Sequence, residues 1–202
     1  MQARIATFEN RDVSMADELI GLVRSRVASG DAIPGADRHL LLLDPKNGAA
    51  LGMTFFDTED DLLAAGPAFE ALDAEIPEAV RGRRIAFRSW EVALDELGDG
   101  LLAARTGSVD APSWRVVELV YLVREQIATE AAELDGWRGA VLLVDRASGE
   151  TRTITFWESD DALRRSEVRE AQLRIRVAAE IGASVTRVDR YAVAVDSVPT
   201  AV

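Results

Sequence analysis

Residues Leu40–Asp60 read LLLLDPKNGAALGMTFFDTED, and the pattern returns at Val141–Asp161 as VLLVDRASGETRTITFWESDD. The two copies align without a gap, so that Asp44 matches Asp145, 101 positions later. Each copy has an apolar run, a turn sequence containing Asp and Gly, and a second apolar run. A Ser or Thr followed directly by acidic residues ends each copy. This order predicts a β-hairpin followed by a capped helix. A repeat of this length indicates two copies of one structural unit.

Extending the repeat in both directions predicts the order β-α-β-β-α-β in each half, which is the ferredoxin-like unit. In the first half the outer strands are expected at Arg4–Asn10 and Arg84–Leu94. In the second half they are expected at Leu101–Val109 and Val185–Val195. The sequence therefore predicts an α+β protein made of tandem ferredoxin-like (βαββαβ) repeats.

The hairpin strands are apolar on both faces. The strands of a sheet with one solvent-exposed face alternate apolar and polar residues, whereas Leu40–Leu43 and Val141–Val144 are apolar throughout. Helices cover one face, and the sheet of the opposite half is the most economical cover for the other. We therefore expect the repeats, residues 1–97 and 98–202, to pack as an intramolecular pseudo-dimeric α/β barrel. A homodimer that buries these faces between chains is the alternative.

The composition limits the classes of partner. The chain has 48% hydrophobic and 29% charged residues, and its 35 acidic and 23 basic residues give a net charge of −12. This charge argues against nucleic-acid binding, and no apolar run reaches the roughly 20 residues that span a membrane. The N-terminus has no signal-peptide layout, so a cytoplasmic protein is expected. With no cysteine, one histidine and no nucleotide-binding motif, we expect no metal and no cofactor.

Several stretches resemble the dimeric α+β barrel superfamily, in particular antibiotic biosynthesis monooxygenase-like domains. They are IATFENRD from Ile5, Trp157–Leu163 with its first-half counterpart Phe56–Leu62, Trp90-Glu91-Val92 and Tyr191-Ala192-Val193. The resemblance covers nearly the whole chain as two fused copies. It implies a small-molecule-binding protein that could carry out cofactor-independent oxygenation of a hydrophobic aromatic or quinol substrate. The alternative is a non-catalytic ligand-sensing or protein-interaction module of the same fold.

Haem-degrading members of this superfamily are matched at one functional residue of three. The resemblance implies a functional Asn at Asn10, followed by a Trp and a His in the second helix. The Trp position aligns near Ala65 in one half and Ser166 in the other, and neither second helix contains a His. The pattern therefore disfavours haem degradation.

His39 and Asn10 are the candidate catalytic residues. A histidine in a pocket can accept a proton near neutral pH, although a lone His at the start of a strand is often only hydrogen-bonded. Asn10 could orient an oxygenated substrate, but the run Asn10–Asp12 is also typical of a turn. The second half has Ala140 and Ala111 at the matching positions, so at most one half is expected to hold a complete site.

The predicted ligand pocket is aromatic, with one cation and one anion. Its candidates are Arg88, Trp90, Asp189, Tyr191, Phe55 and Phe156. On the fourth strands, residues two apart share a face, so each half pairs a charge with an aromatic ring. Such a patch suits a planar ligand. The alternative is an Arg88–Asp189 ion pair that holds the halves together, with the phenylalanines in the core.

Four helix features complete the prediction. Trp114–Val123 is expected to form a helix that is apolar nearly all round and buried on two sides. Ser14 is expected to cap the first helix, and Gly66-Pro67 to split the second. Glu170 and Arg174 form an i, i+4 pair that is typical of a solvated helix face.

Overall fold

The computed structural model describes residues 1–28 and 33–197, except for the side chains of residues 28 and 126–128. The chain forms two compact units, Met1–Trp90 with Tyr191–Val202, and Glu91–Arg190. The stretch Gly30–Gly35, which contains Pro34 and predicts a break between the first helix and the second strand, lies partly outside the described residues. The predicted division into repeats near residue 97 follows the sequence repeat and stays a prediction.

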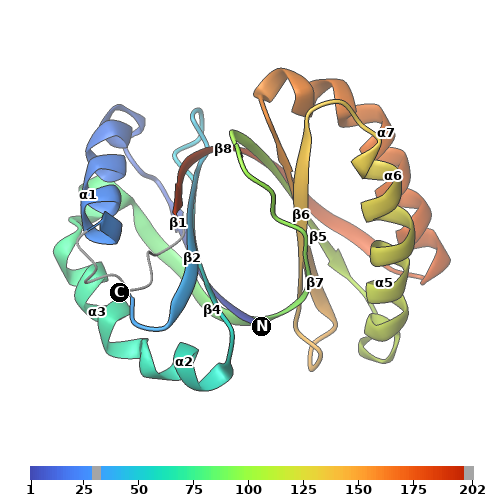
Figure 1. The fold of residues 1–202 in the computed structure, drawn as a ribbon, viewed down its shortest axis with the longest axis horizontal. Helices are drawn as coiled ribbons and strands as arrows, with labels where there is room; N and C mark the ends of the chain where they lie inside the picture. Colours follow the sequence, from blue (N-terminus) through green and yellow to red (C-terminus); the bar gives the residue numbers. More distant parts are fainter. Residues whose placement is uncertain (29–32, 198–202) are drawn as a thin grey trace. The chain divides into compact units, whose positions relative to one another are not determined.

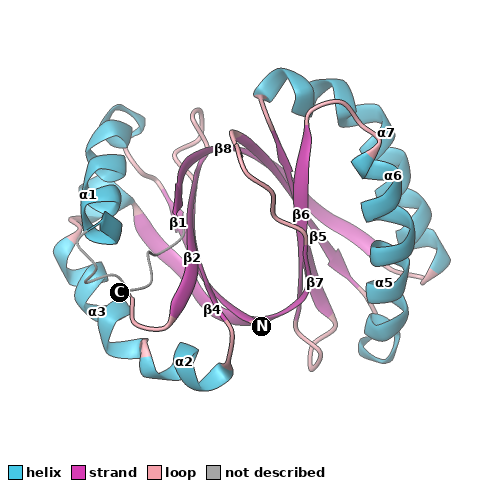
Figure 2. Ribbon diagram, viewed as in Figure 1, coloured by secondary structure: helices cyan, strands magenta, loops and turns pink. Residues whose placement is uncertain are grey.

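The first unit has a sheet with helices on one face (Figures 1 and 2). Its elements are β1 (Gln2–Glu9), the 3₁₀ turn η1 (Val13–Met15), α1 (Ala16–Ala28), β2 (Ala36–Leu43), β3 (Ala50–Phe56), α2 (Glu59–Ala64), α3 (Gly66–Glu75), α4 (Glu78–Arg81) and the first part of β4 (Arg83–Asp95). The C-terminal part of β8 (Ser184–Ser197) pairs with β2 in this unit.

The second unit repeats this arrangement, with helices again on one face of the sheet (Figure 2). Its elements are β5 (Ala103–Asp110), the 3₁₀ turn η2 (Ser113–Arg115), α5 (Val116–Leu122), the π-helical turn η3 (Val123–Ala128), α6 (Thr129–Ala132), β6 (Trp137–Val144), β7 (Glu150–Trp157), α7 (Asp160–Glu180) and the first part of β8. The last part of β4 pairs with β6 in this unit.

The hydrogen-bonded strand order is β1-β3-β2-β8-β5-β7-β6-β4, which is that of a closed barrel. Strand β3 lies antiparallel between β1 and β2, and β7 lies antiparallel between β5 and β6. The hairpin registers repeat as well, because Leu43 opposes Ala50 and Val144 opposes Thr151. The predicted α+β class, with ferredoxin-like units joined in one barrel within one chain, is confirmed.

Both hairpin turns depend on an aspartate and a glycine. Asp44 Oδ1 accepts hydrogen bonds from the backbone N–H groups two and three residues later, at 2.7 and 3.0 Å. Asp145 Oδ1 accepts the equivalent bonds at 3.0 and 3.3 Å. Gly48 and Gly149 then adopt φ values of 68° and 83°, which glycine adopts without steric cost. The turn chemistry predicted from the repeat is confirmed.

Gly149→Ala is expected to lower the free energy of unfolding by about 2 kcal/mol, because φ is positive and the new Cβ would lie 2.1 Å from the carbonyl oxygen of Ala111. Gly21→Ala is the control, since Gly21 lies in α1 with no atom within 4 Å of its Cβ position. That change should stabilise the protein by about 0.5–1 kcal/mol. Denaturant unfolding measures both, and equal stability of the two variants would contradict the prediction.

The helix starts and breaks correct one expectation and confirm another. Asp12, and not Ser14, caps the first helical turn: its Oδ1 accepts from the Ser14 backbone N–H at 2.9 Å. The aspartate precedes the turn, so its carboxylate reaches the exposed N–H groups. The predicted split at Gly66-Pro67 is confirmed, because α2 ends at Ala64 and α3 begins at Gly66. Helix α7 has neither residue and runs unbroken for 21 residues.

Helix α5 is buried on one side only. Val116 and Leu119 are buried with the core of the second unit. Trp114, just before the helix, is 75% exposed, and Val117 and Tyr121 are also exposed. Within the described residues the helix therefore buries one side, against the core of the second unit, and not two. Among the described helices, none has the length and apolar character to cross a membrane.

Candidate functional site

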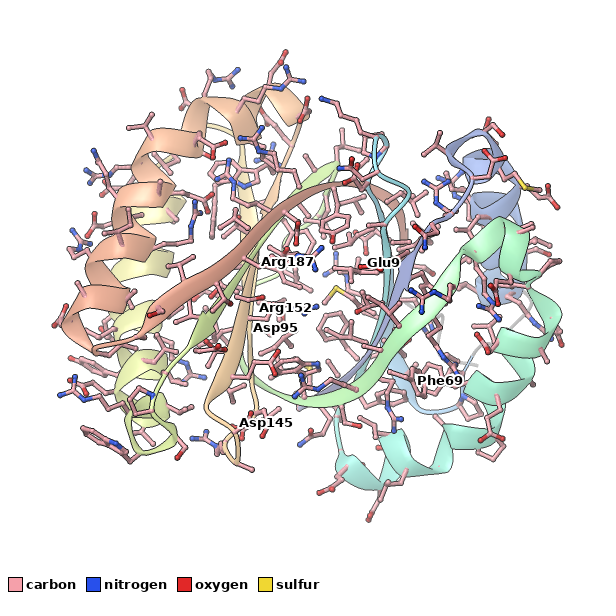
Figure 3. The ribbon with its side chains drawn as sticks, turned by 180° about the vertical axis from the view of Figure 1, so that it is seen from behind. Glu9, Phe69, Asp95, Asp145, Arg152 and Arg187 are labelled. Carbon is pink, nitrogen blue, oxygen red and sulfur yellow. The ribbon has the colours of Figure 1, made fainter. Side chains whose placement is uncertain are left out.

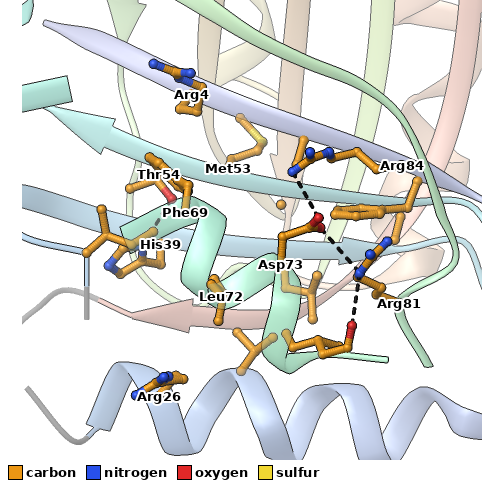
Figure 4. Close-up of a pocket in the computed structure, with 18 of the residues that line it drawn as sticks. Arg4, Arg26, His39, Met53, Thr54, Phe69, Leu72, Asp73, Arg81 and Arg84 are labelled. Carbon is orange, nitrogen blue, oxygen red and sulfur yellow. Dashed lines mark hydrogen bonds and ion pairs between the residues drawn. The ribbon is translucent and has the colours of Figure 1, made fainter. Parts of the chain in front are cut away.

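The first unit contains a cavity of about 300 Å³, lined by its sheet and by α1 and α3 (Figure 4). Its walls are mostly apolar: Phe8 and Met53 come from the sheet, and Leu19, Phe69 and Leu72 from the helices. In Figure 3, Phe69 lies on the sheet side of α3. A space of this size lined in this way suits a small hydrophobic ligand.

His39 lines the cavity from β2 and is 6% exposed. Its Nδ1 lies 3.2 Å from Oγ1 of Thr54, its cross-strand neighbour on β3. Its Nε2 is buried and has no hydrogen-bond partner among the described residues. Burial disfavours the charged ring and lowers the pKa of His39 to about 4, so the imidazole is neutral at pH 7. The structure thus places this predicted residue in a cavity with one ring nitrogen available to a ligand.

Arg4 extends the same row of side chains on the other side of Thr54. It opposes Thr54 from β1 and also lines the cavity. Its guanidinium lies 4.8 Å from the ring centroid of Phe87 and 5.7 Å from that of Phe69, within cation–π range. Its Nε is buried without a hydrogen-bond partner, and burial lowers the pKa of Arg4. Arg4, Thr54 and His39 therefore form one polar row across three strands.

The cavity wall carries an excess of positive charge. Among the described residues, four arginines and one carboxylate line it. That carboxylate, Asp73, is already held by Arg81 at 3.3 Å and Arg84 at 3.4 Å (Figure 4). Arg26 is paired with Glu75. The site is therefore cationic within a chain whose net charge is −12.

The equivalent space in the second unit is nearly filled, with about 40 Å³ left. Arg105, the repeat partner of Arg4, is 1% exposed and forms an ion pair with buried Glu170. Arg174 lies 3.5 Å from the same carboxylate. The expectation of a solvated face is wrong at Glu170, because this residue points to the core and not to water. The sequence position that matches His39 is Ala140.

Asn10 lies apart from the cavity. It is exposed, follows the end of β1 and has a φ of 58°, a conformation that Asn tolerates better than most residues. It does not line the cavity. The structure thus brings one of the two predicted catalytic residues to the cavity, and the other to a turn.

The six predicted pocket residues lie elsewhere. Phe55 and Phe156 are buried in the core, and Arg88 lies with its guanidinium 4.6 Å from the Trp90 ring centroid. Asp189 is ion-paired with Arg187 at 2.5 Å, and Tyr191 is buried. None of the six lines the cavity of the first unit. Within the described ranges, no group of three acidic or histidine side chains could hold a metal ion.

Sequence reasoning missed Arg4 and Phe69, which contribute the cationic and aromatic parts of the cavity. The alignment of the repeat contains the signal, because it matches Arg4 with Arg105 and Phe69 with Glu170. A charged residue in one half and an aromatic residue in the other, at a position that faces the sheet, marks a functional difference between the halves.

No family model matches the chain. It is 34% identical over 103 residues to an uncharacterised protein of Mycobacterium tuberculosis strain H37Rv. The matched region covers 50% of this chain and 43% of that protein. The chain thus spans less than half the length of this curated relative, which has no stated activity.

Solved structures are similar over almost the whole chain. A proposed monooxygenase of Lactobacillus acidophilus NCFM has a TM-score of 0.69 at 11% identity, covering 100% of this chain and 98% of that one. An anthrone oxidase-like protein has a TM-score of 0.64 at 17% identity, covering 98% of this chain and 93% of that one. A ferredoxin-fold protein of Listeria monocytogenes 4b F2365, related to antibiotic biosynthesis monooxygenases, has a TM-score of 0.54 at 9% identity. This match covers 95% of the present chain and 94% of the Listeria chain.

These similarities confirm the resemblance to antibiotic biosynthesis monooxygenase-like proteins at the level of the fold. At these identities they define the class of architecture, a monooxygenase-like ferredoxin-fold barrel, and not the reaction.

Proposed function

We propose that the first unit binds a hydrophobic aromatic molecule in its cavity and oxygenates it without a cofactor. The observation that carries this proposal is the buried Nε2 of His39, which has no hydrogen-bond partner in the described part of the chain and belongs to a residue that lines an apolar cavity of about 300 Å³. Binding replaces water around the reacting groups and holds them in place. The monooxygenase-like fold supports the same proposal.

The reaction needs only a proton acceptor, the substrate and O₂. In the tautomer in which Nδ1–H donates to Thr54, Nε2 of His39 is free to accept a proton. A CH₂ group that is flanked by aromatic rings and conjugated through them with a carbonyl group loses its proton to Nε2, and the electron pair is delocalised onto that carbonyl oxygen as an enolate. The enolate and the imidazolium compensate each other's charge. Neither ion is therefore left unpaired in an apolar space.

Oxygen then completes the reaction. The enolate transfers two electrons to O₂ as a C–O bond forms, and the peroxide takes the proton back from His39. Loss of water from the resulting hydroperoxide breaks the O–O bond and the remaining C–H bond. The CH₂ group and O₂ thereby become C=O and H₂O, with no other oxidant.

Gly52→Val is expected to weaken binding about tenfold or more, the equivalent of about 1.4 kcal/mol, by filling the cavity. Gly52 lines the cavity and no atom lies within 4 Å of its Cβ position, so the side chain enters empty space without strain. Thr153→Val, at the same repeat position in the second unit, is the control and should not change binding. Calorimetry with a panel of polycyclic phenols, quinols and aryl ketones that carry such a CH₂ group measures the effect, and an oxygen electrode measures turnover.

The results separate the two functions. Oxygen uptake that disappears in His39→Ala, while binding remains, supports the oxygenase. Saturable binding without oxygen uptake supports the non-catalytic ligand-sensing alternative. Binding that Gly52→Val leaves unchanged would show that the cavity is not the site.

A further inference from the structure

The second unit shows what an arginine at this position binds. Arg105 and Arg4 occupy the same place, because each opposes the matching threonine of its neighbouring strand, Thr155 or Thr54. Both arginines line the space between their own sheet and helices. Their surroundings can therefore be compared position by position.

Arg105 is surrounded by polar groups of α7. Its guanidinium donates to the carbonyl oxygen of Leu163 at 2.7 Å, to Oγ of Ser166 at 3.2 Å and to the carboxylate of Glu167 at 3.2 Å. It also forms the buried ion pair with Glu170. Burial lowers the pKa of Arg105 to about 10, so the side chain remains charged at neutral pH and needs this carboxylate.

The first unit lacks every one of these polar side chains. The positions of Ser166, Glu167 and Glu170 are occupied by Ala65, Gly66 and Phe69. Among the described residues, Arg4 forms no ion pair with a carboxylate, and aromatic rings hold its guanidinium instead. Phe69 lines the open cavity of the first unit at the position where Glu170 lines the nearly filled space of the second.

The charge of the wall favours an anion over a neutral group. Asp73 is the carboxylate among the described residues that line this cavity, as Glu170 is in the second unit, but Asp73 is already paired with Arg81 and Arg84. Arg4 is half-buried, and its buried Nε has no hydrogen-bond partner among the described residues. Withdrawing a cation from water without a counter-ion is costly, and a ligand carboxylate would offset that cost with two parallel hydrogen bonds. The apolar walls would accommodate the rest of the molecule.

We propose that the cavity of the first unit selects a planar hydrophobic carboxylate, whose charged group pairs with Arg4 where Glu170 pairs with Arg105 in the second unit. This inference rests on the proposed function and names the substrate class of that site. The ligand carboxylate anchors the molecule at Arg4. Its aromatic body lies along Phe69, toward His39 at the other end of the polar row.

The test compares 2-naphthoate with 2-naphthamide, which has the same shape and no charge, by calorimetry on the full chain. The acid is expected to bind about 10- to 100-fold more tightly than the amide, as charge-assisted hydrogen bonds do. In Arg4→Gln the ratio of the two affinities should fall to about one. Phe69→Glu supplies the internal carboxylate of the second unit and should abolish naphthoate binding. Phe69→Gln, of similar size and neutral, is the matched control: it loses the aromatic contact and should bind both compounds more weakly, but it should keep the preference for the acid over the amide.

The outcomes distinguish this inference from the proposed function. Equal affinity of acid and amide, both sensitive to Gly52→Val, would overturn the inference and leave the cavity as the site. Preference for the acid that persists in Arg4→Gln would also overturn it. Lack of binding of both compounds, while members of the phenol and quinol panel still bind, would overturn the inference alone; lack of binding of every compound would overturn the proposed function as well. Thermal unfolding gives an independent readout, because Phe69→Glu should be more stable than Phe69→Gln if its carboxylate reaches Arg4.

Discussion

Replacing Glu170 by glutamine is expected to lower the free energy of unfolding by about 3 kcal/mol, because a buried arginine then loses its carboxylate partner. Arg105 and Glu170 are 1% and 4% exposed, so water cannot replace the lost partner. Glu167 lies 3.2 Å from Arg105 and is partly exposed. Because Glu167 still attracts Arg105 in the variant, the expected loss of unfolding free energy is at the lower end of the range for broken buried ion pairs. Denaturant unfolding followed by circular dichroism measures the change.

Two further variants show whether the cost comes from the unpaired charge. Glu130→Gln removes the exposed pairs with Arg169 and Arg176 and should cost less than about 1 kcal/mol. The double variant Arg105→Met, Glu170→Leu removes both buried charges and should be close to the wild type in stability. A double variant as unstable as Glu170→Gln would show that packing, and not charge, explains the loss.

Acidification is expected to destabilise the wild type by about 3 kcal/mol more than His39→Ala between pH 6.5 and pH 4. Burial lowers the pKa of His39 to about 4 in the folded protein, whereas the unfolded value is near 6.5. In this window the unfolded state binds a proton that the folded state does not bind. Stability therefore falls as the pH falls, and the His39 contribution becomes constant below pH 4 and above pH 6.5.

The measurement is direct because His39 is the only histidine in the chain. Its ring proton resonances follow the folded-state pKa by NMR, and unfolding curves at a series of pH values give the stability difference. The carboxylates titrate in both proteins, so the difference between wild type and variant isolates His39. A ring that titrates near pH 6.5 in the folded protein would contradict its burial in the cavity.

Much of the fold could be predicted from local chemistry. The turn residues Asp44 and Gly48 act on their own backbone, and so do their counterparts Asp145 and Gly149. The break at Gly66-Pro67 is local for the same reason. The unbroken apolar runs predicted sheets covered on both faces, and the closed strand order is consistent with that. Local signals gave the wrong residue where two neighbours could cap the same helical turn: Ser14 was predicted, and Asp12 is the cap.

The candidate site was less predictable, because its parts come from separate elements. His39 was predicted as the only histidine, but its burial and its contact with Thr54 depend on the pairing of β2 with β3. Asn10 was chosen through a resemblance, and the structure places it at an exposed turn. Residue type alone does not show which side chains share a cavity.

The sequence by itself determined the two repeats, their hairpins and the divergence of the halves, since these follow from residue order and spacing. Only the tertiary structure decided which half is open. Arg4 and Arg105 are alike in the sequence, and their different environments arise where a helix packs on the sheet. There Phe69 leaves a cavity beside one arginine, and Glu170 fills the space beside the other with a carboxylate. The physical reason is that a cation withdrawn from water, in part at Arg4 and fully at Arg105, is stabilised by a counter-ion, and only packing across the chain shows whether the protein supplies one.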